Sequence, residues 1–235
     1  MGRSTAHRLF VITLAVLGVL AIPGAASPAG VIVVFGAHSG SHLTVTTNSG
    51  KIIVRGMMAH AKPRGCHLSA DRMQATCPLA GASAIEIDMG PAADFVEVAD
   101  PLPFPVVAHL GMGSDKFIGN DEPDDCYSEG SRRNRCIGRG GNDVCITGQK
   151  NSDCVGGPGD DFCKTGAGSD GCWGGPGDDV CYMGPGNDGC HGGSGNDRLF
   201  GGPGEDQLYG GSGIDYCDGG PGWGRSHGCE AGRRR

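Results

Sequence analysis

Apolar and β-branched residues between positions 27 and 109 occur in short runs that turn-forming residues separate. This alternation is typical of β-strands, and no run shows the 3.6-residue spacing of an amphipathic helix. Asn48-Ser49-Gly50 separates two of the runs and has the composition of a hairpin turn. Strands are therefore predicted at Val31–Phe35, Leu43–Thr47, Lys51–Arg55, Ile85–Asp88, Phe95–Val98 and Val106–Ala108.

From Leu110 onward the pattern changes to a period of nine. A typical unit is GGPGDDFCK, at Gly156–Lys164, with glycines at its start, Asp in sixth place and Cys or Leu in eighth place. Units without insertion run from Gly138 to Asp218, after which the series decays and Gly224 stands at an Asp position. A fixed period maintained over this length predicts a solenoid in which each unit buries its apolar side against its neighbours.

Each nonamer divides into a turn and a strand. Glycine suits the turn because the backbone there needs conformations that a Cβ disfavours, and the middle residue of the strand points inward. Alternate turns then fall on opposite edges. The first row of carboxylates is Asp143, Asp161, Asp179, Asp197 and Asp215. The second row is Asp170, Asp188 and Asp206, with Ser152 interrupting it.

Carboxylates stacked at the strand spacing of about 4.8 Å repel one another unless cations lie between them. Carboxylate and carbonyl oxygens in a flexible turn suit Ca²⁺ better than Mg²⁺. Several bound calcium ions are therefore expected as cofactors.

The units resemble the GGxGxDxUx nonapeptide of the hemolysin-type, or repeats-in-toxin (RTX), calcium-binding family. The resemblance implies a right-handed parallel β-roll with calcium held between successive turns, and both rows as its ligands. Asp115 and Asp124 lie in imperfect units and are weaker ligand candidates. The degenerate unit MGPAADFVE, with Asp94, is similar to the region that precedes the repeats in small exported bacterial members.

Twelve cysteines make disulfides the natural expectation for an exported chain. Most stand at the inward eighth position, and a loop closed by Cys66–Cys77 is expected apart from them. Across the roll the pairs would be 126–136, 145–154, 163–172, 181–190 and 217–229. Along each face they would be 126–145, 163–181, 136–154 and 172–190, again leaving 217–229. Geometry does not exclude either set of disulfides, and the set across the roll is favoured. A cysteine zinc site is the alternative to disulfides, but the nine-residue spacing lacks the CxxC pairs that are typical of such sites.

Residues 1–26 have the pattern of a cleavable signal peptide. A basic front precedes the apolar run Leu9–Ile22, which is too short to span a bilayer, and small residues at Gly24 and Ala26 place cleavage after Ala26. Removing Arg3 and Arg8 takes the formal charge from −7 to −9, which disfavours nucleic acid and anionic membranes as partners. The expected organisation is a signal peptide (1–26), a β-rich N-terminal region (27–109) and the repeat β-roll (110–235).

No catalytic grouping stands out. The segment GAHSGS, with His38, lacks the first glycine of a GxSxG motif, so the prediction is a non-enzyme, with a secreted hydrolase as the remote alternative. Trp173, His191 and Tyr209 recur at intervals of 18 on the outer surface and suggest an alternative role as an adhesion or carbohydrate-binding module. The leading expectation is a secreted calcium-binding protein with a structural or binding role outside the cell.

Overall fold

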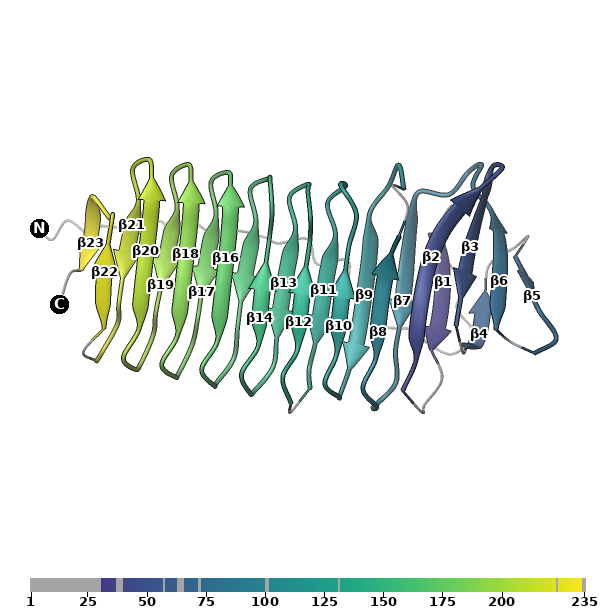
Figure 1. Cartoon of the computed structure of the whole chain (residues 1–235), viewed down its shortest axis with the longest axis horizontal. Helices are drawn as coiled ribbons and strands as arrows, with labels where there is room; N and C mark the ends of the chain where they lie inside the picture. Colours follow the sequence, from purple (N-terminus) through teal and green to yellow (C-terminus); the bar gives the residue numbers. More distant parts are fainter. Residues whose placement is uncertain are drawn as a thin grey trace, which may run out of the picture.

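The computed structural model describes residues 31–36, 40–56, 58–62, 66–71, 73–99, 102–130, 132–222 and 224–233. The expected signal peptide and His38 lie outside these residues. The described chain winds into an elongated solenoid of short strands, with its C-terminal strands at one end and β5 and β6 at the other (Figure 1). The described part of the chain has no helix, and so none that could cross a membrane.

Two sheets face each other along the whole solenoid. The first has the order β23-β21-β19-β17-β15-β13-β11-β9-β7-β1-β4, and the second β22-β20-β18-β16-β14-β12-β10-β8-β2-β3-β6-β5. The strands of the first sheet are β1 (Val31–Gly36), β4 (Met58–Lys62), β7 (Ala84–Asp88), β9 (Val106–Gly111), β11 (Asp125–Ser128), β13 (Val144–Thr147), β15 (Phe162–Lys164), β17 (Val180–Tyr182), β19 (Arg198–Phe200), β21 (Tyr216–Asp218) and β23 (Ala231–Arg233). Those of the second are β2 (His42–Asn48), β3 (Lys51–Arg55), β5 (His67–Leu68), β6 (Gln74–Pro78), β8 (Phe95–Val98), β10 (Lys116–Ile118), β12 (Arg135–Ile137), β14 (Asp153–Val155), β16 (Gly171–Pro176), β18 (Gly189–Ser194), β20 (Gln207–Ser212) and β22 (Arg225–His227).

Consecutive strands of the repeats alternate between the sheets, so each strand pairs in parallel with the strand two places along the chain. Cys163 on β15, for example, pairs with Cys181 on β17, and Cys172 on β16 pairs with Cys190 on β18. This 18-residue offset is the one that the nonamer period predicts. The all-β class and the parallel β-roll are thereby confirmed.

All six strands predicted between residues 27 and 109 are present, and they belong to the same two sheets as the repeats. β2 and β3 form the expected hairpin, with Ser49 and Gly50 at φ values of 48° and 72°. Two successive positive φ values match the right-handed twist of a two-residue hairpin. The sequence pattern did not predict β4, β5 or β6, which extend the sheets at the N-terminal end.

The core is one continuous cluster of inward side chains between the two sheets. Branched aliphatic residues fill its N-terminal part, including Ile85, Ile87 and Val96, whereas cysteines dominate the repeats. In the bonded cross-roll pairs of the repeats the Cα atoms are 5.9–6.9 Å apart, although sheets packed face to face ordinarily lie about 10 Å apart. The small cysteine side chain therefore allows a narrow roll that disulfides can cross.

The disulfides cross the roll but do not follow the favoured pairing throughout. Four expected bonds are present: Cys66–Cys77, Cys126–Cys136, Cys145–Cys154 and Cys217–Cys229. The expected bonds 163–172 and 181–190 are wrong, because Cys172 bonds Cys181 and leaves Cys163 and Cys190 as buried thiols. An inward cysteine has one cross-roll neighbour nine residues before it and another nine residues after it, so the spacing alone does not select between them.

Candidate metal centre

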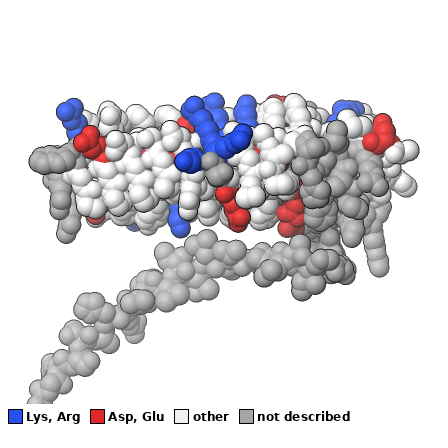
Figure 2. All heavy atoms as spheres, turned by 90° about the horizontal axis from the view of Figure 1, so that it is seen from below, with Lys and Arg blue, Asp and Glu red and all other residues white. Residues whose placement is uncertain are grey.

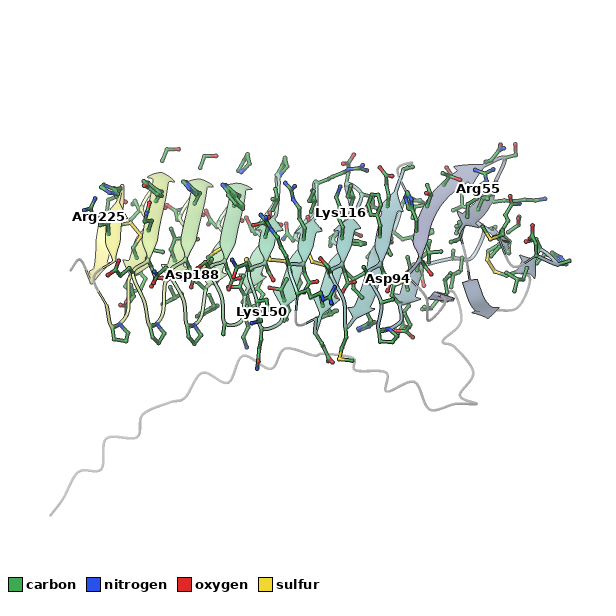
Figure 3. The ribbon with its side chains drawn as sticks, turned by 60° about the horizontal axis from the view of Figure 1, so that its bottom comes forward. Arg55, Asp94, Lys116, Lys150, Asp188 and Arg225 are labelled. Carbon is green, nitrogen blue, oxygen red and sulfur yellow. A yellow bond between two sulfur atoms is a disulfide. The ribbon has the colours of Figure 1, made fainter. Side chains whose placement is uncertain are left out.

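The sixth-position aspartates form two buried rows, one at each edge of the roll, and their first carboxylate oxygens bind the backbone. The N–H of Asp161 donates to Oδ1 of Asp179 at 2.8 Å, and the N–H of Asp179 donates to Oδ1 of Asp197 at the same distance. Bonds of 2.7–3.0 Å repeat this 18-residue step along both rows. Figure 3 labels Asp94 and Asp188, which lie far apart along the same edge of the roll.

The second oxygen of these carboxylates has different surroundings. In nine of the aspartates that the structure describes, Oδ2 is buried and accepts no hydrogen bond. All nine stand at the sixth position of their unit. The set is Asp94, Asp143, Asp161, Asp170, Asp179, Asp188, Asp197, Asp206 and Asp215. A buried carboxylate oxygen without a partner carries a large desolvation cost, which a cation can offset.

The glycine that opens each first-row unit leaves room beside that oxygen. A Cβ on Gly174 would lie 2.1 Å from Oδ2 of Asp179 and 2.7 Å from the carbonyl oxygen of Gly192. The next turn repeats this, with Gly192 beside Asp197 Oδ2 and the Gly210 carbonyl at the same two distances. A carboxylate and a backbone carbonyl therefore face one space that a side chain would fill, and these are the oxygen donors that Ca²⁺ prefers.

The electrostatics of the rows also favour a bound cation. Burial raises the pKa of Asp143 to about 8 and that of Asp161 to about 7, and the neighbouring carboxylates of each row add to the increase. Burial likewise raises the pKa of Asp188 to about 7 and that of Asp179 to about 6. A divalent ion between successive turns would stabilise the ionised form and lower these pKa values.

Asp115 and Asp124, the two weaker ligand candidates, differ from the rest of the rows. Oδ2 of Asp124 accepts the N–H of Asn120 at 2.6 Å, and Oδ2 of Asp115 accepts the hydroxyl of Ser128 at 3.3 Å. In both residues Oδ2 therefore already accepts a hydrogen bond from the protein. Asp94, by contrast, has a buried Oδ2 that accepts no hydrogen bond, which makes it a ligand candidate. The sequence indicated this residue only as part of a degenerate unit.

Sequence reasoning missed two residues that continue the rows. Asn134 takes the sixth-position place in the second row, where its Oδ1 accepts the N–H of Asp115 at 2.9 Å. Its position two residues before Cys136 was the available signal. Glu230 ends the first row, because its Oε2 accepts the N–H of Asp215 at 2.8 Å.

A second, exposed ladder runs beside each buried row and was also missed. Asp178, in fifth place of its unit, accepts the N–H of Asn196 on Oδ1 at 2.7 Å, and its own N–H donates to Asp160 at 2.9 Å. The recurrence of Asn or Asp in fifth place was the signal. This ladder stabilises the turns from the solvent side.

The outer aromatic residues stack on one another along the second sheet. The rings of His191 and Tyr209 are 4.5 Å apart and 5° from parallel, and those of Trp173 and His191 are 6.2 Å apart and 3° from parallel. Where a ring face is turned toward a neighbouring ring, mainly the edge of that ring is left in contact with solvent. Such a row provides little of the open ring face on which sugars stack.

A parallel solenoid with rows of buried carboxylates beside glycine carbonyls defines a calcium-binding β-roll. Residues 155–190 and 191–222 match the family model of the RTX calcium-binding nonapeptide repeat (4 copies). This part of the chain therefore consists of RTX repeats, as the nonamer pattern indicated. No curated protein and no solved structure gives a significant match.

Calcium is thus the cofactor that the repeats and their donor atoms both indicate. When bound, the ion supplies positive charge between carboxylates of successive turns. Backbone carbonyls such as that of Gly192 beside Asp179 would add to the ligand set, because no three carboxylates of one row come within 4.8 Å of one another among the residues described.

Proposed function

We propose that this chain is a secreted protein whose β-roll requires calcium for its full stability and serves a structural or binding role outside the cell. The observation that carries the proposal is the series of buried Oδ2 oxygens without hydrogen-bond partners along both edges. Ions bound there contribute folding free energy directly, by about 2.7 kcal/mol for each independent site at a hundredfold excess over Kd.

We further propose that the first row binds calcium more tightly than the second. Every unit of the first row opens with glycine, at Gly138, Gly156, Gly174, Gly192 and Gly210. In the second row Thr147, Thr165 and Met183 occupy that place and only the Asp206 unit opens with glycine, at Gly201. Ser152 and Asn134 also replace two carboxylates of this row. The second row thus has less room and less negative charge.

Export is supported by the signal-like residues 1–26 and by five disulfides, because disulfides persist in oxidising compartments. Expression of the full chain in an exporting host tests this. The N-terminal sequence of the recovered protein should begin at Ser27. Recovery of an uncleaved chain from the cytoplasm would contradict the proposal.

Calcium dependence is tested by circular dichroism and calorimetric titration of chelated protein, with disulfides intact and then reduced. The informative variant is Asp179→Asn, which removes one buried charge of the first row. We expect it to lose at least tenfold in affinity at its sites and about 1.4 kcal/mol or more of calcium-dependent stability.

Asp178→Asn is the matched control. Asp178 is the adjacent residue, it is exposed, and Asn already occupies the equivalent place at Asn142 and Asn196. It should titrate like the unmodified protein. Absence of any calcium response in both oxidised and reduced protein would refute the proposal.

Carbohydrate binding by Trp173, His191 and Tyr209 is not favoured, because His191 and Tyr209 each stack between two rings and only Trp173, at the end of the stack, has a face without a ring partner. A glycan-array signal that Trp173→Ala removes would reverse this judgement.

A further inference from the structure

A group of metal-binding side chains lies on the outer face of the first sheet, away from both aspartate rows. Glu86 and Asp88 are two residues apart on β7, where Ile85 and Ile87 point into the core, so both carboxylates lie on the outer side. His109 on β9 is the direct pairing partner of Asp88. Parallel register therefore brings an imidazole beside two carboxylates.

The three side chains meet at their donor atoms. One donor atom from each of Glu86, Asp88 and His109 lies within 4.8 Å of the other two, and His109 Nε2 is 4.0 Å from Glu86 Oε1. The imidazole stacks on Tyr127 of β11, with ring centres 5.1 Å apart and planes 12° from parallel. This packing limits the rotation of the His109 ring and holds Nε2 toward the carboxylates.

The three side chains lie at a surface hollow with acidic surroundings. The hollow over the site is lined by Glu86, Asp88, Met89, His109, Gly111, Tyr127 and Glu129, and none of these is Lys or Arg. Asp125, two residues before Tyr127 on β11, accepts the hydroxyl of Tyr127 at 3.2 Å and adds a further carboxylate. Partial burial raises the pKa of both Glu86 and Asp88, which a bound cation would offset.

We propose that Glu86, Asp88 and His109 form a Zn²⁺ site that is chemically distinct from the calcium rows. Zn²⁺ binds imidazole nitrogen and carboxylate oxygen together, whereas Ca²⁺ takes oxygen ligands. Three protein ligands leave a fourth position open to the hollow. The site does not depend on the RTX units, since β7 and β9 precede the repeats that match the family model.

The test is calorimetric titration of the oxidised, untagged protein with Zn²⁺ in the presence of saturating Ca²⁺. We expect one zinc ion per chain, and at least a tenfold loss of affinity in His109→Ala and in Glu86→Gln. His191→Ala is the matched control, because His191 also lies on an outer face and stacks on an aromatic ring, but its neighbours in the stack are Trp173 and Tyr209. It should bind zinc like the unmodified protein.

Two outcomes would overturn the assignment. Either the calcium-loaded protein binds no zinc, or His109→Ala binds it unchanged, which would place the ion at the aspartates or at the buried thiols of Cys163 and Cys190. Substitution with Co²⁺ separates these sources, because thiolate ligands add strong near-ultraviolet absorption that nitrogen and oxygen ligands lack. An unchanged calcium-dependent dichroism spectrum shows that each variant folds.

Discussion

The two oxygens of a sixth-position aspartate have different partners. In Asp179, Oδ1 accepts the backbone N–H of Asp161, whereas Oδ2 is buried without a hydrogen bond in the described structure. The residue therefore aligns successive turns through one oxygen and presents the other to a ligand. Asn could replace the first role but not the charge of the second, which is why Asp179→Asn separates the two.

The opening glycines of the first row should tolerate no side chain. In Gly174→Ala the new Cβ would meet Asp179 Oδ2 at 2.1 Å and the Gly192 backbone at 2.7 Å. We expect a cost of about 1–3 kcal/mol in unfolding free energy, together with weaker calcium binding.

Gly189→Ala is the control for this substitution, since nothing lies within 4 Å of a Cβ built there. Chemical denaturation of both variants in calcium measures the difference. Equal stability of the two would show that the space beside Asp179 is not used.

Stability without calcium should fall as the pH rises. The pKa of Asp143 is raised to about 8 and that of Asp161 to about 7, from 3.8 in the unfolded chain. Between roughly pH 4 and pH 7 the folded, calcium-free protein therefore binds more protons than the unfolded chain, so each rise in pH favours unfolding.

Saturating calcium should weaken or reverse this trend, because the ion competes with protons for the same carboxylates. Urea denaturation from pH 4.5 to pH 8, in chelator and in calcium, provides the measurement. A calcium-free stability that rises over this range would contradict the raised pKa values.

At the scale of the element, each strand of the repeats contributes one inward side chain to a narrow core. Leu199 and Leu208 fill that place in two units, but cysteine fills it in most of the others. Because cysteine has little apolar surface, cross-roll disulfides supply part of the stability that aliphatic packing supplies elsewhere. Each closes a short loop and is worth about 2–3 kcal/mol.

The Cys172–Cys181 disulfide predicts the number of free thiols in the protein. Cys163 and Cys190 remain thiols, and burial raises their pKa well above that of an exposed thiol, so neither ionises readily. We expect an alkylating reagent to leave the native protein unmodified and to label these two residues after unfolding without reductant.

Peptide mapping by mass spectrometry identifies the labelled positions. The Cys66–Cys77 peptide is an internal control, because that bond should stay intact throughout. Complete protection after unfolding would contradict the Cys172–Cys181 pairing, and the disulfide-linked peptides would then show whether the bonds are 163–172 and 181–190 or 163–181 and 172–190.

At the scale of the whole molecule, the roll is a one-dimensional stack in which each coil contacts the coils before and after it. Both sheets continue from the N-terminal strands into the repeats without interruption (Figure 1). The face shown in Figure 2 displays few acidic side chains, although the chain has 26 Asp and Glu, because many of the aspartates are buried in the rows. Eleven of the 26 carboxylates are thus buried along the two edges of the roll, where the surface does not display them.

This architecture should tolerate loss of a whole coil but not of half a coil. Deleting residues 192–209 removes two nonamers and no cysteine, and it leaves every later turn on its original edge. We expect a folded protein with a modest loss of stability and fewer bound calcium ions.

Deleting residues 192–200 alone removes one nonamer and is the matched comparison. It would move Asp215 and the capping Glu230 to the opposite edge and exchange the sheets of all later strands. We expect a markedly larger loss of stability by denaturation and dichroism. Equal stability of the two deletions would contradict the two-row description.

The nine-residue period by itself determined the solenoid, the two rows and their 18-residue step, because a fixed repeat length constrains every turn in the same way. Local turn chemistry similarly determined the β2–β3 hairpin. In the degenerate units, where Asn134 replaces Asp and Asp94 stands outside the regular array, the pattern was too weak to assign roles.

Only the tertiary structure decided three things. The pairing of Cys172 with Cys181 depends on which of two equally spaced neighbours the sulfur faces. Oδ2 of Asp124 is not available to a cation because it accepts the backbone N–H of Asn120, a contact that the nine-residue period does not predict. The meeting of Glu86, Asp88 and His109 depends on the register of β7 against β9, a pairing between segments that share no repeat. These are contacts between chain segments, and a local pattern carries no information about them.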